Sequence, residues 1–126
     1  MPRAFRPLTT LDALDLAIQE SQTHPVPVFK HSLTCGTSAE ANEEMAALLD
    51  DSRMPTDIYL VRVQTERAIS NAITDRFRIR HESPQVLILD RGSVVWHGSH
   101  WQVTASQVLA QLERAARKRS EVSSPA

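Results

Sequence analysis

The stretch Val26-Pro27-Val28-Phe29-Lys30-His31-Ser32-Leu33-Thr34-Cys35-Gly36-Thr37-Ser38 joins a strand to a helix. Its proline cannot continue a helix, and residues that precede proline prefer extended geometry, so a short strand is predicted over Val26 to His31. A run of helix formers follows from Ala39 to Asp50, with apolar side chains at helical spacing. The only cysteine of the chain, Cys35, therefore lies where a strand has ended and a helix begins.

The rest of the chain continues this alternation of helices and strands. The predicted elements are a helix capped by Thr9 or Thr10 and ending near residue 21, a strand over 57–63, a helix after Thr65, a strand over 85–89, a turn over 90–93, a strand over 94–96, a loop over 97–100 and a final helix from Thr104. By the right-handed crossover rule, the two strand–helix units imply a parallel pair, to which the hairpin adds antiparallel strands. This order predicts an α/β protein with a thioredoxin-like fold: a central mixed four-stranded sheet flanked by helices, with an extra N-terminal helix.

Length and composition predict one domain. The chain has 126 residues, of which 41% are hydrophobic and 23% charged, close to globular averages. We expect an N-terminal tail over 1–8, the folded domain over 9–119 and a disordered C-terminal tail over 120–126. The net charge of -1 gives no reason to expect nucleic acid or a membrane as a partner.

The compartment is predicted from the same residues. No apolar stretch follows the N-terminal arginines, so neither a signal peptide nor a membrane span is expected. A single cysteine cannot form a disulfide within the chain. Both points favour a reducing cytoplasm.

The surroundings of Cys35 suggest a reactive thiol. A thiol attacks only as its thiolate, and the unpaired N–H groups and dipole of a helix N-terminus stabilise that negative charge. Gly36 lets the backbone turn closely, while Thr37 and Ser38 offer hydroxyl donors. The alternative is a small, buried and inert cysteine, as most free cysteines are.

A proline at the start of a predicted buried strand is the second candidate feature. Pro84 opens that strand and cannot donate a hydrogen bond to it. If the Ser83–Pro84 bond is cis, the backbone of Ser83 points outward and can pair with an extended substrate. The alternative is a trans proline that simply begins a strand.

The histidines are weaker candidates. His31 precedes Cys35 by four residues and can contact its loop. His81, His97 and His100 lack a cysteine or carboxylate at metal-ligand spacing, so solvated or hydrogen-bonded histidines are expected rather than a metal site.

Four blocks of sequence carry a family resemblance. They are Phe29-Lys30-His31-Ser32-Leu33-Thr34-Cys35, Ala68-Ile69-Ser70-Asn71, His81-Glu82-Ser83-Pro84-Gln85-Val86 and Val95-Trp96-His97-Gly98-Ser99-His100-Trp101. Together they resemble the monothiol bacilliredoxins, the YtxJ-like proteins of the bacillithiol system, over residues 10 to 113.

The resemblance implies a thioredoxin fold with Cys35 as nucleophile and Ser83–Pro84 as a cis-proline site. It also implies removal of a low-molecular-weight thiol, bacillithiol, from mixed disulfides on client proteins. The small thiol is then a co-substrate, and no cofactor stays bound. An external thiol or dithiol partner must regenerate Cys35. The chain is expected to be a monomer or weak dimer. The candidate residues that bind the thiol or substrate are His31, Thr34, Gly36, Thr37, Ser38, Ser83, Pro84 and His100, with no metal ligand.

Two alternatives follow from the same residues. Family members often carry proline after the cysteine, whereas Cys35-Gly36-Thr37-Ser38 resembles the C-G-x-S loop of monothiol glutaredoxins, which bind glutathione and can carry a 2Fe–2S cluster between two subunits. The Gly-Gly-x-Asp motif of glutaredoxins is missing, and residues 89–93 occupy its place. The other alternative is a thioredoxin-fold binding module that is not a catalyst.

We predict that the pKa of the Cys35 thiol lies below the ~8.5 of a free cysteine, because a helix N-terminus favours the thiolate. Thiolate absorbance followed against pH measures it. A pKa at or above the free value would instead favour the inert binding module.

Overall fold

The computed structural model describes residues 3–33 and 36–123, and for Thr37, Val122 and Ser123 it describes the backbone only. In chain order the elements are β1 (Phe5–Pro7), α1 (Leu11–Glu20), β2 (Val26–His31), α2 (Gly36–Leu49), β3 (Ile58–Arg62), α3 (Arg67–Phe77), β4 (Gln85–Asp90), β5 (Ser93–Ser99), the 3₁₀ helix η1 (His100–Gln102) and α4 (Ala105–Ser123).

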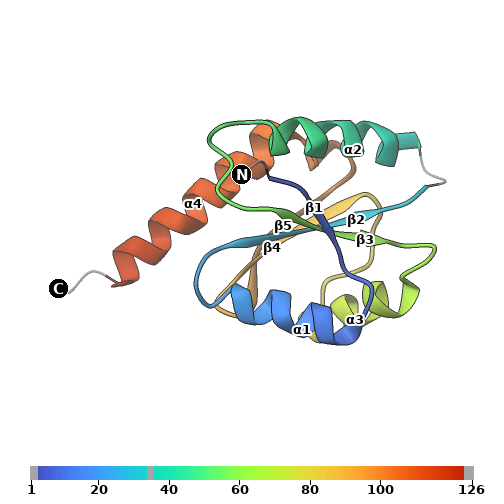
Figure 1. Ribbon diagram of the computed structural model, residues 1–126, viewed down its shortest axis with the longest axis horizontal. Coiled ribbons are helices and arrows are strands. Elements are labelled where there is room, and N and C mark those ends of the chain that lie inside the picture. Colours follow the sequence, from blue (N-terminus) through green and yellow to red (C-terminus); the bar gives the residue numbers. More distant parts are fainter. Residues whose placement is uncertain (1–2, 34–35, 124–126) are drawn as a thin grey trace.

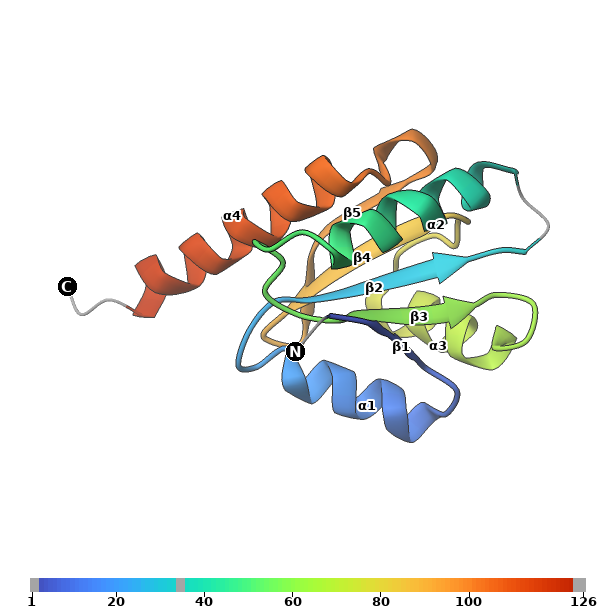
Figure 2. The same cartoon turned by 45° about the horizontal axis from the view of Figure 1, so that its top comes forward.

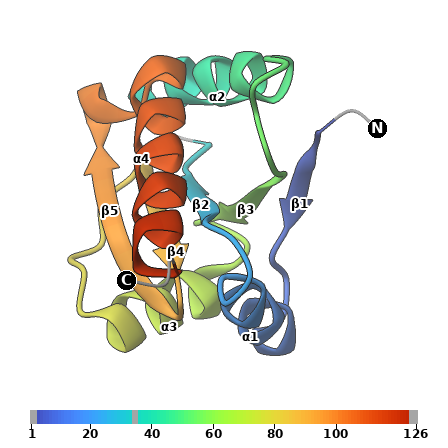
Figure 3. The same ribbon diagram turned by 90° about the vertical axis from the view of Figure 1, so that its left-hand side faces the viewer.

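The described elements form three layers, with a five-stranded sheet between two pairs of helices. The strand order is β1-β3-β2-β4-β5; β1, β3 and β2 run parallel, and β4 and β5 run antiparallel to their neighbours. Helices α2 and α4 cover one face and α1 and α3 the other, as Figures 1 and 3 show. The predicted α/β class and thioredoxin-like element order are confirmed, although the sheet has five strands rather than four.

The central strand β2 is buried on both faces. It pairs with β3 on one side and with β4 on the other. Phe29, which is 0% exposed, belongs to the core beneath α2 and α4, whereas Val26 and Val28 belong to the core above α1 and α3. The alternation of side chains along a strand therefore divides one apolar run between two cores.

Local signals place the ends of several elements where the sequence predicts them. The side chain of Thr10 accepts a hydrogen bond from the backbone N–H of Ala13 at the start of α1, and the side chain of Thr104 accepts from that of Gln107 at the start of α4. Gly92, with a φ of +78°, supplies the left-handed residue that the β4–β5 turn needs.

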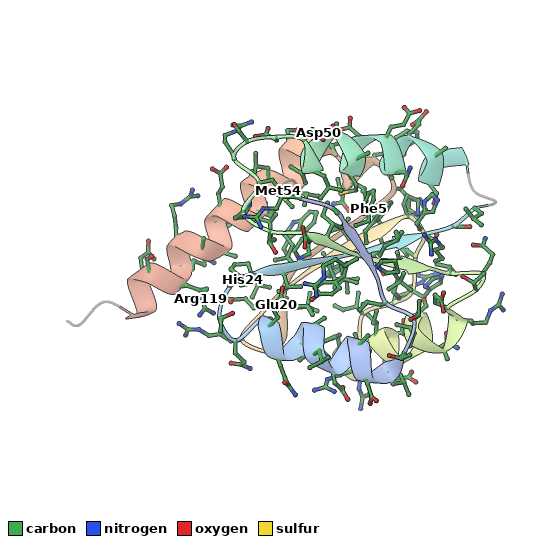
Figure 4. All side chains as sticks on the ribbon, viewed as in Figure 1. Phe5, Glu20, His24, Asp50, Met54 and Arg119 are labelled. Atoms are coloured by element: carbon green, nitrogen blue, oxygen red, sulfur yellow. The ribbon has the colours of Figure 1, made fainter. Side chains whose placement is uncertain are left out.

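The N-terminal segment corrects the prediction of a tail over 1–8. Residues 5–7 form β1, which pairs with β3, and Leu8 is only 1% exposed. Phe5 packs against the core under α2, with its ring centroid 6.3 Å from that of Phe29 (Figure 4). The guanidinium of Arg6 lies 4.9 Å from the ring centroid of Tyr59. A three-residue edge strand has no periodicity to detect, because its stability comes from these distant partners.

Two further elements, β5 and α4, extend beyond their predicted ends. The segment 97–100, expected as a loop, belongs to β5 as far as Ser99, because Gly98 and Ser99 remain in register with β4. A Cβ on Gly98 would lie 2.6 Å from the Trp96 ring, so glycine is required there for the ring to pack. Helix α4 continues to residue 123, whereas a disordered tail was expected from residue 120.

The later part of α4 extends beyond the sheet (Figures 1 and 2). Arg119 connects this part of the helix to the rest of the fold. The Arg119 guanidinium lies 2.6 Å from Asp90 Oδ1 and donates to the backbone carbonyl of Gln22 at 2.9 Å. Arg119 and His24, both labelled in Figure 4, line the same surface pocket. One side chain thus connects α4 to the β4–β5 turn and to the loop after α1.

Leu112→Ala is expected to lower the free energy of unfolding by about 2–5 kcal/mol, because Leu112 is 1% exposed in the core between α4 and the sheet. Chemical denaturation measures the effect. Leu16→Ala is the matched control: Leu16 is 63% exposed, so its change should stay within about 0.5 kcal/mol. Equal losses in the two variants would contradict this assignment of the core.

Candidate functional site

One edge of the sheet gathers most of the described candidate residues. The carboxyl ends of β2 and β3 meet here, with the backbone N–H of Val63 donating to the His31 carbonyl at 2.9 Å. The start of β4 lies at the same edge, since Lys30 pairs with Gln85 across the sheet. Thr34 and Cys35 themselves lie outside the described residues, between Leu33 and Gly36, the first residue of α2 (Figure 2).

The first turn of α2 is anchored to the end of β2 through Ser38. This residue is 0% exposed, and its Oγ accepts a hydrogen bond of 3.3 Å from the backbone N–H of Ser32. Thr37 lies between Gly36 and Ser38 in the same helical turn. A Cβ added to Gly36 would meet none of the described atoms within 4 Å, so packing against them does not require glycine there. The first turn contains no acidic residue, so no carboxylate within it opposes negative charge at this helix end.

The segment before β4 holds the predicted proline feature. The Ser83–Pro84 peptide bond is cis, as the family resemblance implies, and Pro84 is buried. The Pro84 carbonyl accepts a hydrogen bond of 3.0 Å from the backbone N–H of His100, an exposed residue with a φ of 52°. The structure therefore brings three of the predicted site residues together: Ser83, Pro84 and His100.

His31 lies at the end of β2 on the side of the sheet that α2 covers. Its ring centroid is 5.6 Å from that of Phe29. Burial and the positive charge of Arg62 lower the pKa of His31, and a backbone contact with Ser38 acts in the opposite direction. Among the described residues, three buried side-chain atoms at this edge lack a hydrogen-bond partner: His31 Nδ1, Ser83 Oγ and Gln85 Oε1. His31 and Ser83 are predicted site residues, and each of the three atoms has unused hydrogen-bonding capacity.

Gln64 is a structural part of this edge that sequence reasoning missed. Its Oε1 accepts from the backbone N–H of Leu33 at 3.1 Å, and its Nε2 donates to Ser32 Oγ at 2.7 Å. Gln64 thereby supports the residues that lead into the Cys35 segment. No sequence signal identified it, because its partners are 31 and 32 residues away.

Two large apolar side chains stand exposed near the same edge. Leu33 is 67% exposed, and Trp101 in η1 is 79% exposed. Trp101 follows His100, the residue bonded to the Pro84 carbonyl. The Ser99 hydroxyl donates to the Glu82 carboxylate, which lowers the pKa of Glu82 and connects the end of β5 to the segment before β4.

A second polar cluster lies on the α3 side of the sheet. Lys30 is 0% exposed, and its Nζ lies 3.2 Å from the Ser70 carbonyl, 3.2 Å from Thr74 Oγ1 and 3.4 Å from His81 Nδ1. Burial lowers the pKa of Lys30 to about 8. Burial and the nearby ammonium also lower the pKa of His81, against a smaller opposing effect of Glu82. Sequence reasoning did not select Lys30, because lysine is almost never fully buried.

The described part of the chain contains neither a cluster of metal ligands nor a helix that could span a membrane. Within residues 3–33 and 36–123, no group of three or more histidine, cysteine, aspartate or glutamate side chains is placed to hold a metal ion. No helix in that part of the chain is long and apolar enough to cross a membrane.

Similar solved structures define the structural class. A structure named as a candidate oxidoreductase with a thioredoxin fold matches with a TM-score of 0.76 and 33% identity, over 86% of this chain and 93% of that chain. Malassezia sympodialis thioredoxin matches with a TM-score of 0.72 and 14% identity, over 92% and 95% of the two chains. Fasciola hepatica thioredoxin matches with a TM-score of 0.70 and 16% identity, over 87% and 98%. The fold is that of the thioredoxins.

The family is defined by sequence. The family model described as monothiol bacilliredoxin BrxC matches residues 6–108, and the chain belongs to this family. Family membership and the thioredoxin-like fold together support a thiol oxidoreductase role.

The burial of Lys30 makes the stability of the protein depend on pH. Its pKa is lowered from 10.5 to about 8 in the folded protein, so between these values the unfolded chain binds more protons. The free energy of unfolding should therefore rise with pH from about 8 toward 10.5, by at most about 3 kcal/mol, while the full penalty remains below pH 8.

Denaturant titrations at about pH 7.5 and 9.5, both below the usual tyrosine pKa of about 10, measure this rise in the wild type, in Lys30→Met and in Lys118→Met. Lys118 is the other lysine of the chain, so Lys118→Met should keep the wild-type slope while Lys30→Met flattens it. A Lys30→Met variant with the wild-type slope would show that Lys30 is not the responsible group.

Proposed function

We propose that this protein is a monothiol thiol–disulfide oxidoreductase that removes bacillithiol from mixed disulfides on client proteins, with Cys35 as the nucleophile. The observation that carries the proposal is the family match over residues 6–108. The geometry supports it, because Leu33 and Gly36, the described residues on either side of Thr34 and Cys35, lie at the sheet edge that also holds the cis-proline segment.

The proposed reaction has two exchanges. The Cys35 thiolate attacks the bacillithiol sulfur of the mixed disulfide, so that a Cys35–bacillithiol disulfide forms and the client leaves as a thiolate that takes a proton from water. A second small thiol, or a dithiol partner, then attacks this disulfide and restores the Cys35 thiolate. The chain has no second cysteine to do so, and Ser38 occupies the position of the second sulfur in a C-x-x-C motif.

The residues around the edge have distinct proposed tasks. The N-terminus of α2 stabilises the thiolate, and Ser38 holds that helix end against β2 through its bond to Ser32. The backbone of Ser83 pairs with the client chain in the manner of an added strand. The remaining predicted contacts with the small thiol are Thr34, Gly36, Thr37, His31 and His100, and we propose the reducing cytoplasm as the site of action.

The isolated protein should stop at a one-to-one Cys35–bacillithiol adduct. When it is incubated with a bacillithiol-modified client, intact masses should show loss of the adduct from the client and an equal gain on this chain. Ser38→Cys supplies a second thiol at C-x-x-C spacing, so its adduct should resolve into an internal disulfide and release bacillithiol. Cys35→Ser should transfer nothing.

Other outcomes select among the alternatives. Transfer by Cys35→Ser, or no transfer by the wild type, refutes the proposal. Transfer of glutathione but not bacillithiol moves the protein to a glutaredoxin-like role. A coloured preparation that carries a 2Fe–2S cluster would favour a cluster carrier.

A further inference from the structure

A fully buried lysine lies close to the site edge and has no part in the exchange chemistry. Lys30 is 0% exposed and is the residue of β2 next to His31. Removing an ammonium from water is costly unless its N–H groups find acceptors. The environment of Lys30 therefore needs an explanation beyond packing.

The acceptors around Lys30 match the donors of a charged lysine. An ammonium has three N–H groups, and Nζ has three acceptors within reach: the Ser70 carbonyl, Thr74 Oγ1 and His81 Nδ1. His81 Nδ1 accepts from the ammonium in the tautomer that carries its proton on Nε2, and we assign that tautomer from this contact. None of these three partners is a carboxylate, so bonds to neutral groups hold the cation in place.

His81 connects this cluster to the segment that enters β4. It precedes Pro84 by three residues, and its Nδ1 also lies 3.3 Å from Ser70 Oγ. At the other end of the segment, Gln85 Nε2 donates to the Arg80 carbonyl at 3.1 Å. Gln85 is also the sheet partner of Lys30. The segment before β4 is thus held through His81 to α3 and to the central strand.

We propose that Lys30 is a positioning residue: through His81 it fixes the 81–84 segment, so that Ser83 and Pro84 are held ready for the client chain. The inference rests on the proposed function, because it assigns Lys30 to client binding at that site. It predicts that loss of Lys30 weakens the use of clients while the intrinsic reactivity of Cys35 is retained.

The test compares Lys30→Met with Lys118→Met. Lys118 is the other lysine of the chain and lies exposed on α4. For Lys30→Met, the KM for a bacillithiol-modified client should rise roughly tenfold, the equivalent of one charge-assisted hydrogen bond. The rate of Cys35 alkylation by iodoacetamide should stay within about twofold, which a general structural defect would not allow. Amide hydrogen exchange at residues 81–83 should become faster, and Lys118→Met should change none of these quantities.

A double-mutant cycle tests whether Lys30 acts through His81. His81→Phe removes the acceptor and should raise the KM about as much as Lys30→Met, and the double variant should add little to either. His81→Asn places a neutral acceptor near the same position and should restore the wild-type KM to within about twofold. These His81 variants leave the buried lysine in place, so the KM and hydrogen exchange of His81→Phe still test whether His81 fixes the 81–84 segment if Lys30→Met does not fold. An unchanged KM and unchanged exchange in His81→Phe would overturn the proposal.

Three results would overturn the proposal. They are additive effects in the cycle, a loss of alkylation rate with an unchanged KM, and unchanged hydrogen exchange at residues 81–83 in both Lys30→Met and His81→Phe. If the wild type transfers no bacillithiol, the proposed function fails, but the hydrogen-exchange comparison still tests the positioning role.

Discussion

The burial of β2 on both faces is the constraint on which the rest of the structure depends. This strand lies between a parallel and an antiparallel neighbour, and its successive side chains enter opposite cores. Its end therefore has a fixed position relative to both helical layers. Because α2 begins at Gly36, only five residues after His31, the end of β2 also fixes the position of the site. Ser32 then bonds to both Ser38 and Gln64 at this short connection.

The two-sided burial also explains why Lys30 and His31 have separate environments. They are adjacent in sequence, yet Lys30 reaches α3 while His31 contacts Phe29 and the first turn of α2. Both have a lowered pKa, chiefly because burial disfavours the charged form. One strand thus presents a cation to the segment before β4 on one face and an imidazole to the start of α2 on the other.

The parts of the fold that could be predicted from sequence are those with local signals. Val26–His31 was predicted with the bounds it has, because proline and a run of apolar residues define it. The Thr10 cap and the Gly92 turn depend on a few neighbouring residues. The edge strand β1 was missed because three residues carry no pattern, and its partners Phe29 and Tyr59 are remote. For the site, the family resemblance selected Ser83, Pro84 and His100, which the structure brings together. The acceptors of Lys30 lie 40 to 51 residues away, and no spacing rule connects them.

The exposed ring of Trp101 gives the molecule a built-in optical label. The chain has two tryptophans, and their environments differ. Trp96 packs over Gly98, whereas the side chain of Trp101, two residues after the end of β5 at Ser99, is 79% exposed. A chain that docked against the Pro84–His100 edge would cover the second indole and leave the first untouched. Emission from one fluorophore would then report occupancy, while the other supplied an internal reference, without a dye or an added cysteine.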